Sequence, residues 1–162
     1  MNKIINMQNI ANKLRYELIK LIHDSKTAHL GSSLSCMDIL VTLYFSKHGL
    51  PKNINNHKNI KDTFILSKGH AAPALYVILN KKKLISNQSL KNYSKPGSKL
   101  EEHPNSKING VLVSSGSLGH GLSLSAGFSV ADKINKKKNF HYLIMSDGEC
   151  NEGSVWEAAM FI

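Results

Sequence analysis

The sequence of 162 residues is poor in cysteine, tryptophan and arginine, with two cysteines, one tryptophan and Arg15 as the single arginine. Cys36 and Cys150 lack the spacing of metal ligands, and one possible pair does not make a disulfide framework. The absence of any apolar run of about 18 residues excludes a membrane-spanning helix. The amino-terminal segment also lacks the continuous apolar stretch of a secretory signal. We therefore expect a cytoplasmic protein with a single domain.

Acidic residues are scarce, and the formal net charge is +10. The excess is almost entirely lysine, which lacks the planar guanidinium fork that reads base edges in nucleic acids. The lysine runs at residues 81–83 and 136–138 each follow an expected helix, where cations favour the negative end of the dipole. No aromatic residues alternate with these lysines as a base-stacking platform requires. We therefore expect a solvated, anion-attracting surface and no nucleic-acid partner.

Hydrophobic periodicity predicts an α/β fold. Apolar residues recur at helical spacing over residues 6–24 and 35–47, and both stretches are expected to be helices. Short apolar runs at residues 62–66, 111–113 and 140–145 are expected to be strands, and turn residues followed by a helical stretch come after each of them. Repeated strand–turn–helix order predicts a parallel sheet flanked by helices.

A carboxylate follows the last expected strand directly. Asp147 lies in the turn after residues 140–145, and ligands in open α/β sheets bind beyond the carboxyl ends of the strands. Ser154 and Glu157 form a capping-box pattern, which predicts a helix with Ser154 as its N-cap. A carboxylate beside a helix amino terminus suits a hard divalent cation together with a phosphate. An ordinary Asp-Gly turn is the simpler explanation for this segment taken alone.

The whole string SDGECNEGSVWEA resembles the transketolase signature GDGE-x-x-EG-x-x-WEA, with Ser146 in place of the first glycine. Four other segments resemble the same family in the same order. They are AHLGSSLSCMDILVTLYF, DTFILSKGHAAPALYVIL, LEEHPN and SSGSLGHGLS. Ala28, Leu30 and Glu102 depart from the residues usual in the family. The resemblance implies a thiamine-diphosphate-binding fold, specifically its diphosphate-binding domain.

The resemblance also implies roles for individual residues. Those implied to be catalytic are His29 and His103, those implied to bind thiamine diphosphate are His70, Gly116, Leu118, Gly148 and Glu152, and Asp147 is implied to bind Mg²⁺ or Ca²⁺. Taken alone, each histidine also has a simpler interpretation: His29 as a surface residue, His70 as a helix cap and His103 as a solvated loop residue. The cofactors that the resemblance implies are thiamine diphosphate and a divalent metal.

The family's activity is transfer of a two-carbon ketol unit from a ketose phosphate to an aldose phosphate. The strings GSSLS and GSLGHGLS favour the split type, which pairs with a carboxyl-terminal transketolase subunit, and the resulting assembly is a homo-oligomer. The family's second metal ligand is an asparagine beyond Ile162, so we expect residues 1–162 to be a single partial domain, incomplete at its carboxyl end. We expect this part to be inactive alone.

Two other function classes fit some of these features. One is a different thiamine-diphosphate enzyme, similar to deoxyxylulose-phosphate synthase or to the decarboxylating subunit of a 2-oxoacid dehydrogenase. The strings SKGHA and WEA favour transketolase over both. The other is a non-catalytic cofactor-binding subunit, for which the substituted positions Ala28, Glu102 and Ser146 are the relevant features. Cofactor binding with metal present distinguishes an intact site from a lost one.

Overall fold

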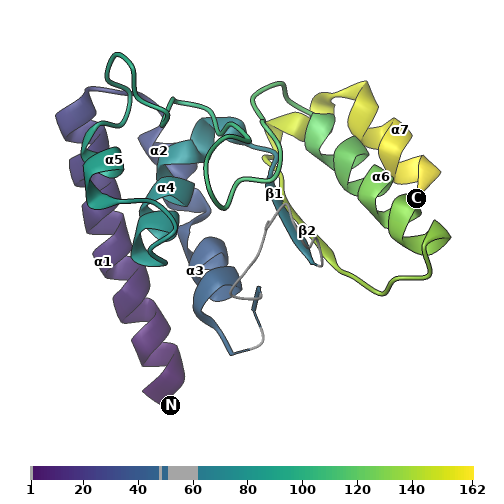
Figure 1. The fold of residues 1–162 in the computed structure, drawn as a ribbon, viewed down its shortest axis with the longest axis horizontal. Helices are drawn as coiled ribbons and strands as arrows, with labels where there is room; N and C mark the ends of the chain where they lie inside the picture. Colours follow the sequence, from purple (N-terminus) through teal and green to yellow (C-terminus); the bar gives the residue numbers. More distant parts are fainter. Residues whose placement is uncertain (1, 48, 51–61) are drawn as a thin grey trace.

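The computed structural model describes residues 2–47, 49–50 and 62–162, and Figure 1 shows their arrangement. Within this part of the chain, helices predominate and two short strands lie near the middle. The elements, in chain order, are α1 (Asn2–Ser25), α2 (Leu30–Ser35), α3 (Met37–Phe45), β1 (Thr63–Leu66), η1 (Gly69–Ala71), α4 (Ala72–Lys81), α5 (Asn87–Lys91), α6 (His120–Ile134), β2 (His141–Ile144), η2 (Gly148–Asn151) and α7 (Gly153–Phe161).

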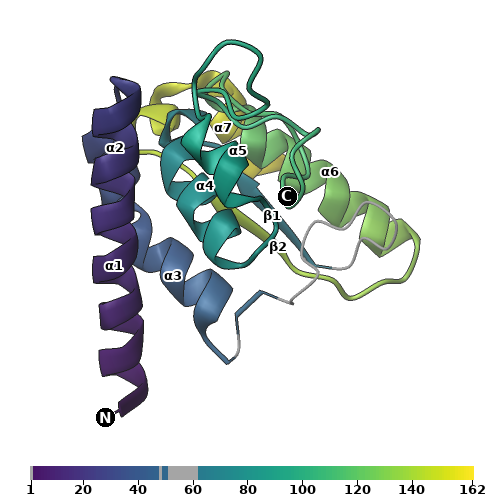
Figure 2. The same cartoon turned by 60° about the vertical axis from the view of Figure 1, so that its left-hand side comes forward.

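Strands β1 and β2 are parallel neighbours, with Thr63 opposite His141 and Leu66 opposite Ile144. Helices cover both faces of this pair. Figures 1 and 2 show α1, α3 and α4 on one side of the strands and α6 on the other. Coverage on both faces explains why β1 is apolar almost throughout and buried at all four positions. The expected α/β class, with a parallel sheet flanked by helices, is confirmed.

The main core lies between the strands and helices α1, α3 and α4. Phe64 and Leu66 point into it, while Ile65 lies on the opposite face of β1. Helix α4 is buried along almost its whole length, because its own residues are apolar on every side of the helix. Helix α1 contributes the stripe Ala11, Leu14, Leu18 and Ile22. This core fixes the position of β1 and of the turn that follows it.

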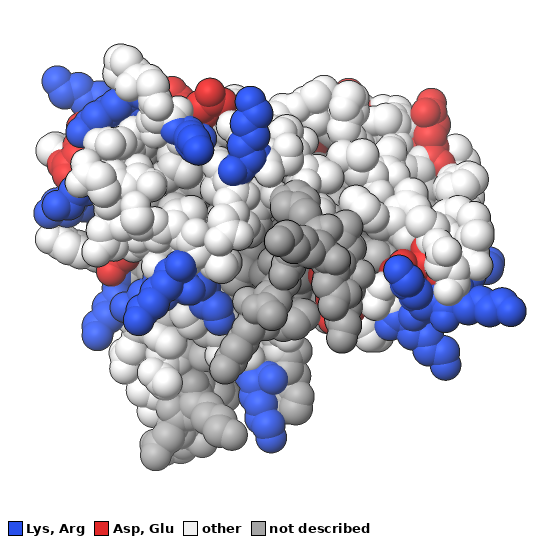
Figure 3. All heavy atoms as spheres, in the orientation of Figure 1, with Lys and Arg blue, Asp and Glu red and all other residues white. Residues whose placement is uncertain are grey.

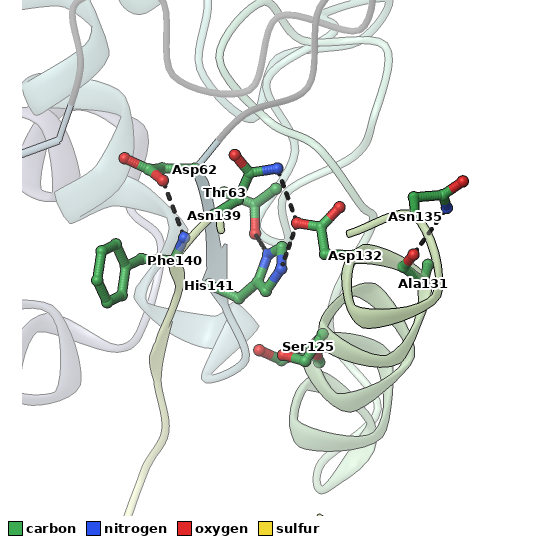
Figure 4. Close-up of polar contacts among 10 residues, drawn as sticks. Asp62, Thr63, Ser125, Ala131, Asp132, Asn135, Asn139, Phe140 and His141 are labelled. Carbon is green, nitrogen blue, oxygen red and sulfur yellow. Dashed lines mark hydrogen bonds and ion pairs between the residues drawn. The ribbon is translucent and has the colours of Figure 1, made fainter. Parts of the chain in front are cut away.

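A buried polar cluster joins α6 to the amino ends of both strands (Figure 4). The His141 ring lies 2.8 Å from the Thr63 hydroxyl through Nδ1 and 3.1 Å from the Asp132 carboxylate through Nε2. Asn139 donates a second hydrogen bond of 2.7 Å to Asp132, and the Phe128 ring stacks on His141 at 5.9 Å between centroids. Both ring nitrogens therefore have partners, so the histidine fixes the distance between α6 and the strands.

Three local predictions were wrong. Residues 111–113 form no strand. Their amino end is a turn in which the amide of Val111 donates to the carbonyl of Ile108 at 3.0 Å. The helix expected at 35–47 is confirmed as α3, two residues shorter at each end, but the short helix α2 lies in the segment between the two expected helices, where no helix was predicted. Helix α7 begins at Gly153, so Ser154 lies inside its first turn, and its N-cap Glu152 makes no side-chain capping bond. The polar segment 50–59, with Pro51 and several asparagines, is expected from its sequence to be a surface loop, and all of it except Leu50 lies outside the described residues.

No helix in the described part of the chain is both long enough and apolar enough to cross a membrane. Basic side chains on the face drawn in Figure 3 lie in separate groups around its edge. Acidic side chains lie beside several of these groups. On this face the lysine excess therefore forms several small basic areas rather than one continuous patch.

Candidate functional site

Two of the predicted site histidines lie side by side. His29 is the N-cap of α2 and has a left-handed backbone with φ of 69°, while His70 lies in η1 directly after β1. Their ring centroids are 5.5 Å apart, with an angle of 51° between the planes. A left-handed backbone is uncommon for residues other than glycine, and local strain of this kind clusters at functional sites. Two segments distant in sequence thus present imidazoles to one region.

His103 reaches the same region on a loop that α4 holds in place. The buried Tyr76 donates from its hydroxyl to the carbonyl oxygens of Glu101 and His103, at 3.0 and 3.1 Å. The His103 ring packs against Gly116, where an added Cβ would lie 3.1 Å from ring atom Cδ2. Glycine at position 116 therefore leaves room for the imidazole. The loop of His103 is therefore anchored to α4, while its exposed ring lies against Gly116.

The loop that carries Gly116 is tied to the carboxyl end of β1. Ser115 donates its hydroxyl to the carbonyl of Leu66 at 2.7 Å and its amide to the carbonyl of Pro104 at 3.1 Å. Gly69, in the turn after β1, packs so closely that an added Cβ would lie 2.8 Å from the backbone nitrogen of Gly116. The Ser115 hydroxyl and these backbone contacts thus join the turn after β1, the His103 loop and the loop at 114–116.

The environment of His70 is electropositive. Burial lowers the pKa of His70 below its ordinary value, the charges of Lys68 and His29 lower it further, Glu149 acts in the opposite direction, and His103 adds a small lowering effect. Lys68 is itself buried and donates to the Ser35 hydroxyl at 3.1 Å. A bound anion would relieve this repulsion and favour the protonated imidazole. The three histidines and Lys68 therefore suit a multiply charged anion.

Glu149 is a residue of the site that we did not predict. Its side chain is fully buried, and its carboxylate accepts hydrogen bonds from the Ser67 hydroxyl, the Gly119 amide and the Ser146 amide and hydroxyl. Burial acts to raise the pKa of Glu149, but these hydrogen bonds lower it more, so it lies below its ordinary value. The only signal in the sequence was that Glu149 is an acidic residue within the string SDGECNEGSVWEA, whose metal and cofactor roles were given to other residues.

The remaining predicted residues lie on exposed segments near this carboxylate. Asp147 is the N-cap of η2, and its exposed carboxylate makes no capping bond. Glu152 approaches Gly119, where an added Cβ would lie 2.8 Å from the Cβ of Glu152. Leu118 is 36% exposed. An added Cβ on Gly148 would meet no atom within 4 Å, so packing does not require glycine there.

The side chains of this region suit a diphosphate, whereas they do not form a complete metal site. Imidazoles from three segments and the Lys68 charge suit phosphate oxygens. A cavity of about 290 Å³ opens beside Gly116, and neither these three histidines nor Lys68 lines it. Ile65, Leu124 and His120 also line this cavity. Among the described residues, no group of three His, Cys, Asp or Glu side chains could hold a metal ion. Asp147 would be one carboxylate ligand of such an ion.

A second constellation looks catalytic by residue type but has no access to a substrate. Thr63, His141 and Asp132 lie in the order of nucleophile, base and orienting acid (Figure 4). Thr63 is 0% exposed, however, and the cluster lies at the amino ends of the strands. Ligands of parallel sheets bind at the opposite end. This cluster therefore stabilises the packing of α6 against the strands.

Comparison with known proteins supports the resemblance seen in the sequence. The family described as "Transketolase, thiamine diphosphate binding domain" matches residues 6–161. An apulose-4-phosphate transketolase subunit of Phocaeicola vulgatus is 39% identical over 151 residues, which are 93% of this chain and 53% of that protein. The 6-deoxy-6-sulfo-D-fructose transketolase subunit SqwG of a Clostridium species is 35% identical over 97% of this chain and 57% of its own length.

A solved structure and a longer relative give the same result. Transketolase from Campylobacter jejuni superposes with a TM-score of 0.82 and 29% identity, over 96% of this chain and 26% of that one. Human transketolase is 35% identical over 98% of this chain and 26% of its own length. The chain thus spans about half the length of the Phocaeicola and Clostridium relatives and about a quarter of the longer enzymes. On its sequence match and its fold, the chain belongs to the transketolase family and corresponds to its thiamine-diphosphate-binding domain.

Proposed function

We propose that this chain is the amino-terminal, cofactor-binding part of a split transketolase. The complete assembly would transfer a two-carbon ketol unit from a ketose phosphate to an aldose phosphate. The observation that carries this proposal is the convergence of His29, His70 and His103 on the loop of Gly116, at the carboxyl end of β1. Three separate segments have no structural need to place imidazoles together beside Lys68, whereas an anionic cofactor and a polyhydroxylated substrate need such groups.

The residues divide by the part of the ligand that they would bind. His70 would hold the diphosphate, because its turn lies beside Lys68. Gly116 and Leu118 would contact the aminopyrimidine and thiazolium region, with Gly148 and Glu152 at the edge of the same site. Asp147 would bind Mg²⁺ or Ca²⁺, since hard cations prefer charged oxygen ligands. Carbon–carbon bond chemistry is what thiamine diphosphate supplies when it is bound.

The protein's own contribution would be orientation and proton transfer. His29 and His103 would hydrogen-bond substrate hydroxyls and exchange protons with them, because imidazole both donates and accepts near neutral pH. The fixed backbones of both residues support this role. His29 caps α2, and the carbonyl of His103 accepts from the buried Tyr76. A fixed backbone limits the positions that the imidazole can take, and such positioning lowers the barrier.

The proposed assembly requires further chains. The Phocaeicola and Clostridium relatives are named as subunits, which supports pairing with a carboxyl-terminal transketolase subunit. We also propose a homo-oligomer of that pair, with Glu152 at the interface where two cofactor sites meet. We also propose a cytoplasmic location. Cys36 and Cys150 are both free, and an exposed thiol such as that of Cys150 stays reduced in the cytosol. Sugar phosphates carry the negative charge that the basic surface attracts.

The proposal is tested by reconstituting the complete assembly with and without thiamine diphosphate and Mg²⁺. We expect ketol transfer from a ketose phosphate only when both cofactors are present, measured by the appearance of the shortened aldose phosphate. Isothermal titration calorimetry with thiamine diphosphate gives a second reading that is independent of the choice of sugar. Binding without transfer across a panel of ketose phosphates would favour a non-catalytic cofactor-binding subunit. Absence of binding would refute the proposal.

A further inference from the structure

The buried carboxylate of Glu149 has a hydrogen-bonding arrangement that stability alone does not explain. One oxygen, Oε1, accepts from the Gly119 amide at 3.0 Å and from the Ser67 hydroxyl. The other, Oε2, accepts from the Ser146 amide at 2.8 Å and from the Ser146 hydroxyl at 3.2 Å. An ionised carboxylate only accepts hydrogen bonds, so four donors and no acceptor around it match the charged form.

The three donor residues come from three different segments of the candidate site. Ser67 ends β1 and precedes the turn of Lys68 and His70. Gly119 ends the loop of Gly116 and Leu118 and is the N-cap of α6, with φ of 82°. Ser146 follows β2 and directly precedes Asp147. Each donor therefore lies within three residues of a group proposed to contact the cofactor or its metal.

We propose that Glu149 is the positioning residue of this site and that it fixes the three cofactor-contacting segments relative to one another. This inference rests on the proposed function. Ser146 belongs to the same device, because its hydroxyl adds a fourth donor that the glycine usual at this position in the family lacks. Glutamate is required rather than glutamine, because the amide NH₂ of glutamine would face two of these donors.

The three histidines of the site do not fix this arrangement. His29, His70 and His103 share a region, but no hydrogen bond joins them among the described residues. The turn of Asp147 is joined to the turn after β1 and to the loop before α6 through Glu149. Loss of the carboxylate would loosen the turn of Asp147 from the other two segments, which Ser115 and the Gly69–Gly116 contact still join, while leaving the buried core between α1 and α4 in place. The effect on cofactor affinity would then exceed what destabilisation alone produces.

The test compares Glu149→Gln with His141→Gln in the complete assembly. His141 is a matched control. Its side chain is also largely buried, both of its ring nitrogens have hydrogen-bond partners, and it lies at the opposite end of the same strands. For each variant, urea unfolding gives stability, and calorimetry gives the Kd for thiamine diphosphate with Mg²⁺ in excess, under conditions where all proteins are folded. We expect both variants to lose stability. We expect the Kd to rise about tenfold or more in Glu149→Gln and to stay within about twofold in His141→Gln.

An unchanged Kd in a folded Glu149→Gln, with wild type binding normally, would overturn the positioning role and leave the proposed function intact. Equal rises in Kd in both variants would also overturn it, because general destabilisation would then explain the effect. A wild-type assembly that does not bind thiamine diphosphate would refute the proposed function itself. If Glu149→Gln does not fold, Ser67→Ala removes one donor, and its Kd must rise several-fold for the proposal to stand.

Discussion

Replacement of Gly69 by alanine tests whether close backbone packing builds the candidate site. Gly69 lies in the turn between β1 and α4, next to His70. A methyl group at this position would lie 2.8 Å from the nitrogen of Gly116 and 2.9 Å from the carbonyl carbon and oxygen of Ser115. All three contacts are to backbone atoms of a loop that is held on both sides, so no side chain can rotate away.

The expected cost follows from these contacts. Forced overpacking of a buried position costs about 1–3 kcal/mol, and the stiffer unfolded chain offsets about 0.4–1 kcal/mol of that. We therefore expect Gly69→Ala to lower the free energy of unfolding by about 1–2 kcal/mol. For a protein of this size, each kcal/mol corresponds to about 2–4 °C in Tm. The methyl group should also separate His70 from Gly116 and weaken cofactor binding.

Urea unfolding and calorimetric titration with thiamine diphosphate measure the two effects. Gly127→Ala is the control, because Gly127 lies inside α6 and an added Cβ would meet no atom within 4 Å. Alanine should stabilise that helix by up to about 1 kcal/mol and leave the Kd unchanged. The packing argument fails if Gly69→Ala is as stable as Gly127→Ala, or if its Kd equals that of wild type.

Three other substitutions address single groups of the site. Asp147→Ala should abolish metal-dependent binding of thiamine diphosphate with an unchanged far-UV circular dichroism spectrum, and an unaltered Kd would refute the metal role. His29→Ala and His103→Ala should each lower turnover by about a hundredfold with cofactor binding largely retained. Turnover within a few-fold of wild type in both variants would exclude catalytic roles. The folded-state pKa of His70 lies below the ordinary value of 6.5, so its contribution to stability is complete above that pH and is lost as the pH falls through the folded-state pKa. The free energy of unfolding should therefore fall more between pH 7 and 5 in wild type than in His70→Asn, and parallel profiles would contradict this.

Local sequence strings selected histidines that the structure brings together. His29, His70 and His103 were assigned because each lies in a short motif, and the structure brings them together at the carboxyl end of β1. The strands at 62–66 and 140–145 were also found, because buried parallel strands are continuous apolar runs between turn residues. Features encoded by neighbouring residues are those that a single sequence reveals.

Features that depend on tertiary contacts were missed. Val111 and Leu112 are buried, which accounts for the apolar run at 111–113, although no strand in the described part of the chain pairs with it. Ser154 matches a capping pattern, but the N-cap of α7 is Glu152, two residues earlier. Glu149 makes hydrogen bonds to residues 30 and 82 positions away, and no local pattern records such partners. Its importance follows only from the folded chain.

The glycines and Glu149 together explain how irregular segments can hold a precise site. Loops are usually the most mobile part of a fold, yet binding residues concentrate on them. Here Gly69 packs directly against the backbone at Gly116, and Gly119 packs against Glu152. Glu149 then accepts hydrogen bonds from donors at the ends of these segments. The site therefore depends on residues that need not touch a ligand, so substitutions at these positions should alter affinity while every proposed ligand-contacting side chain is still present.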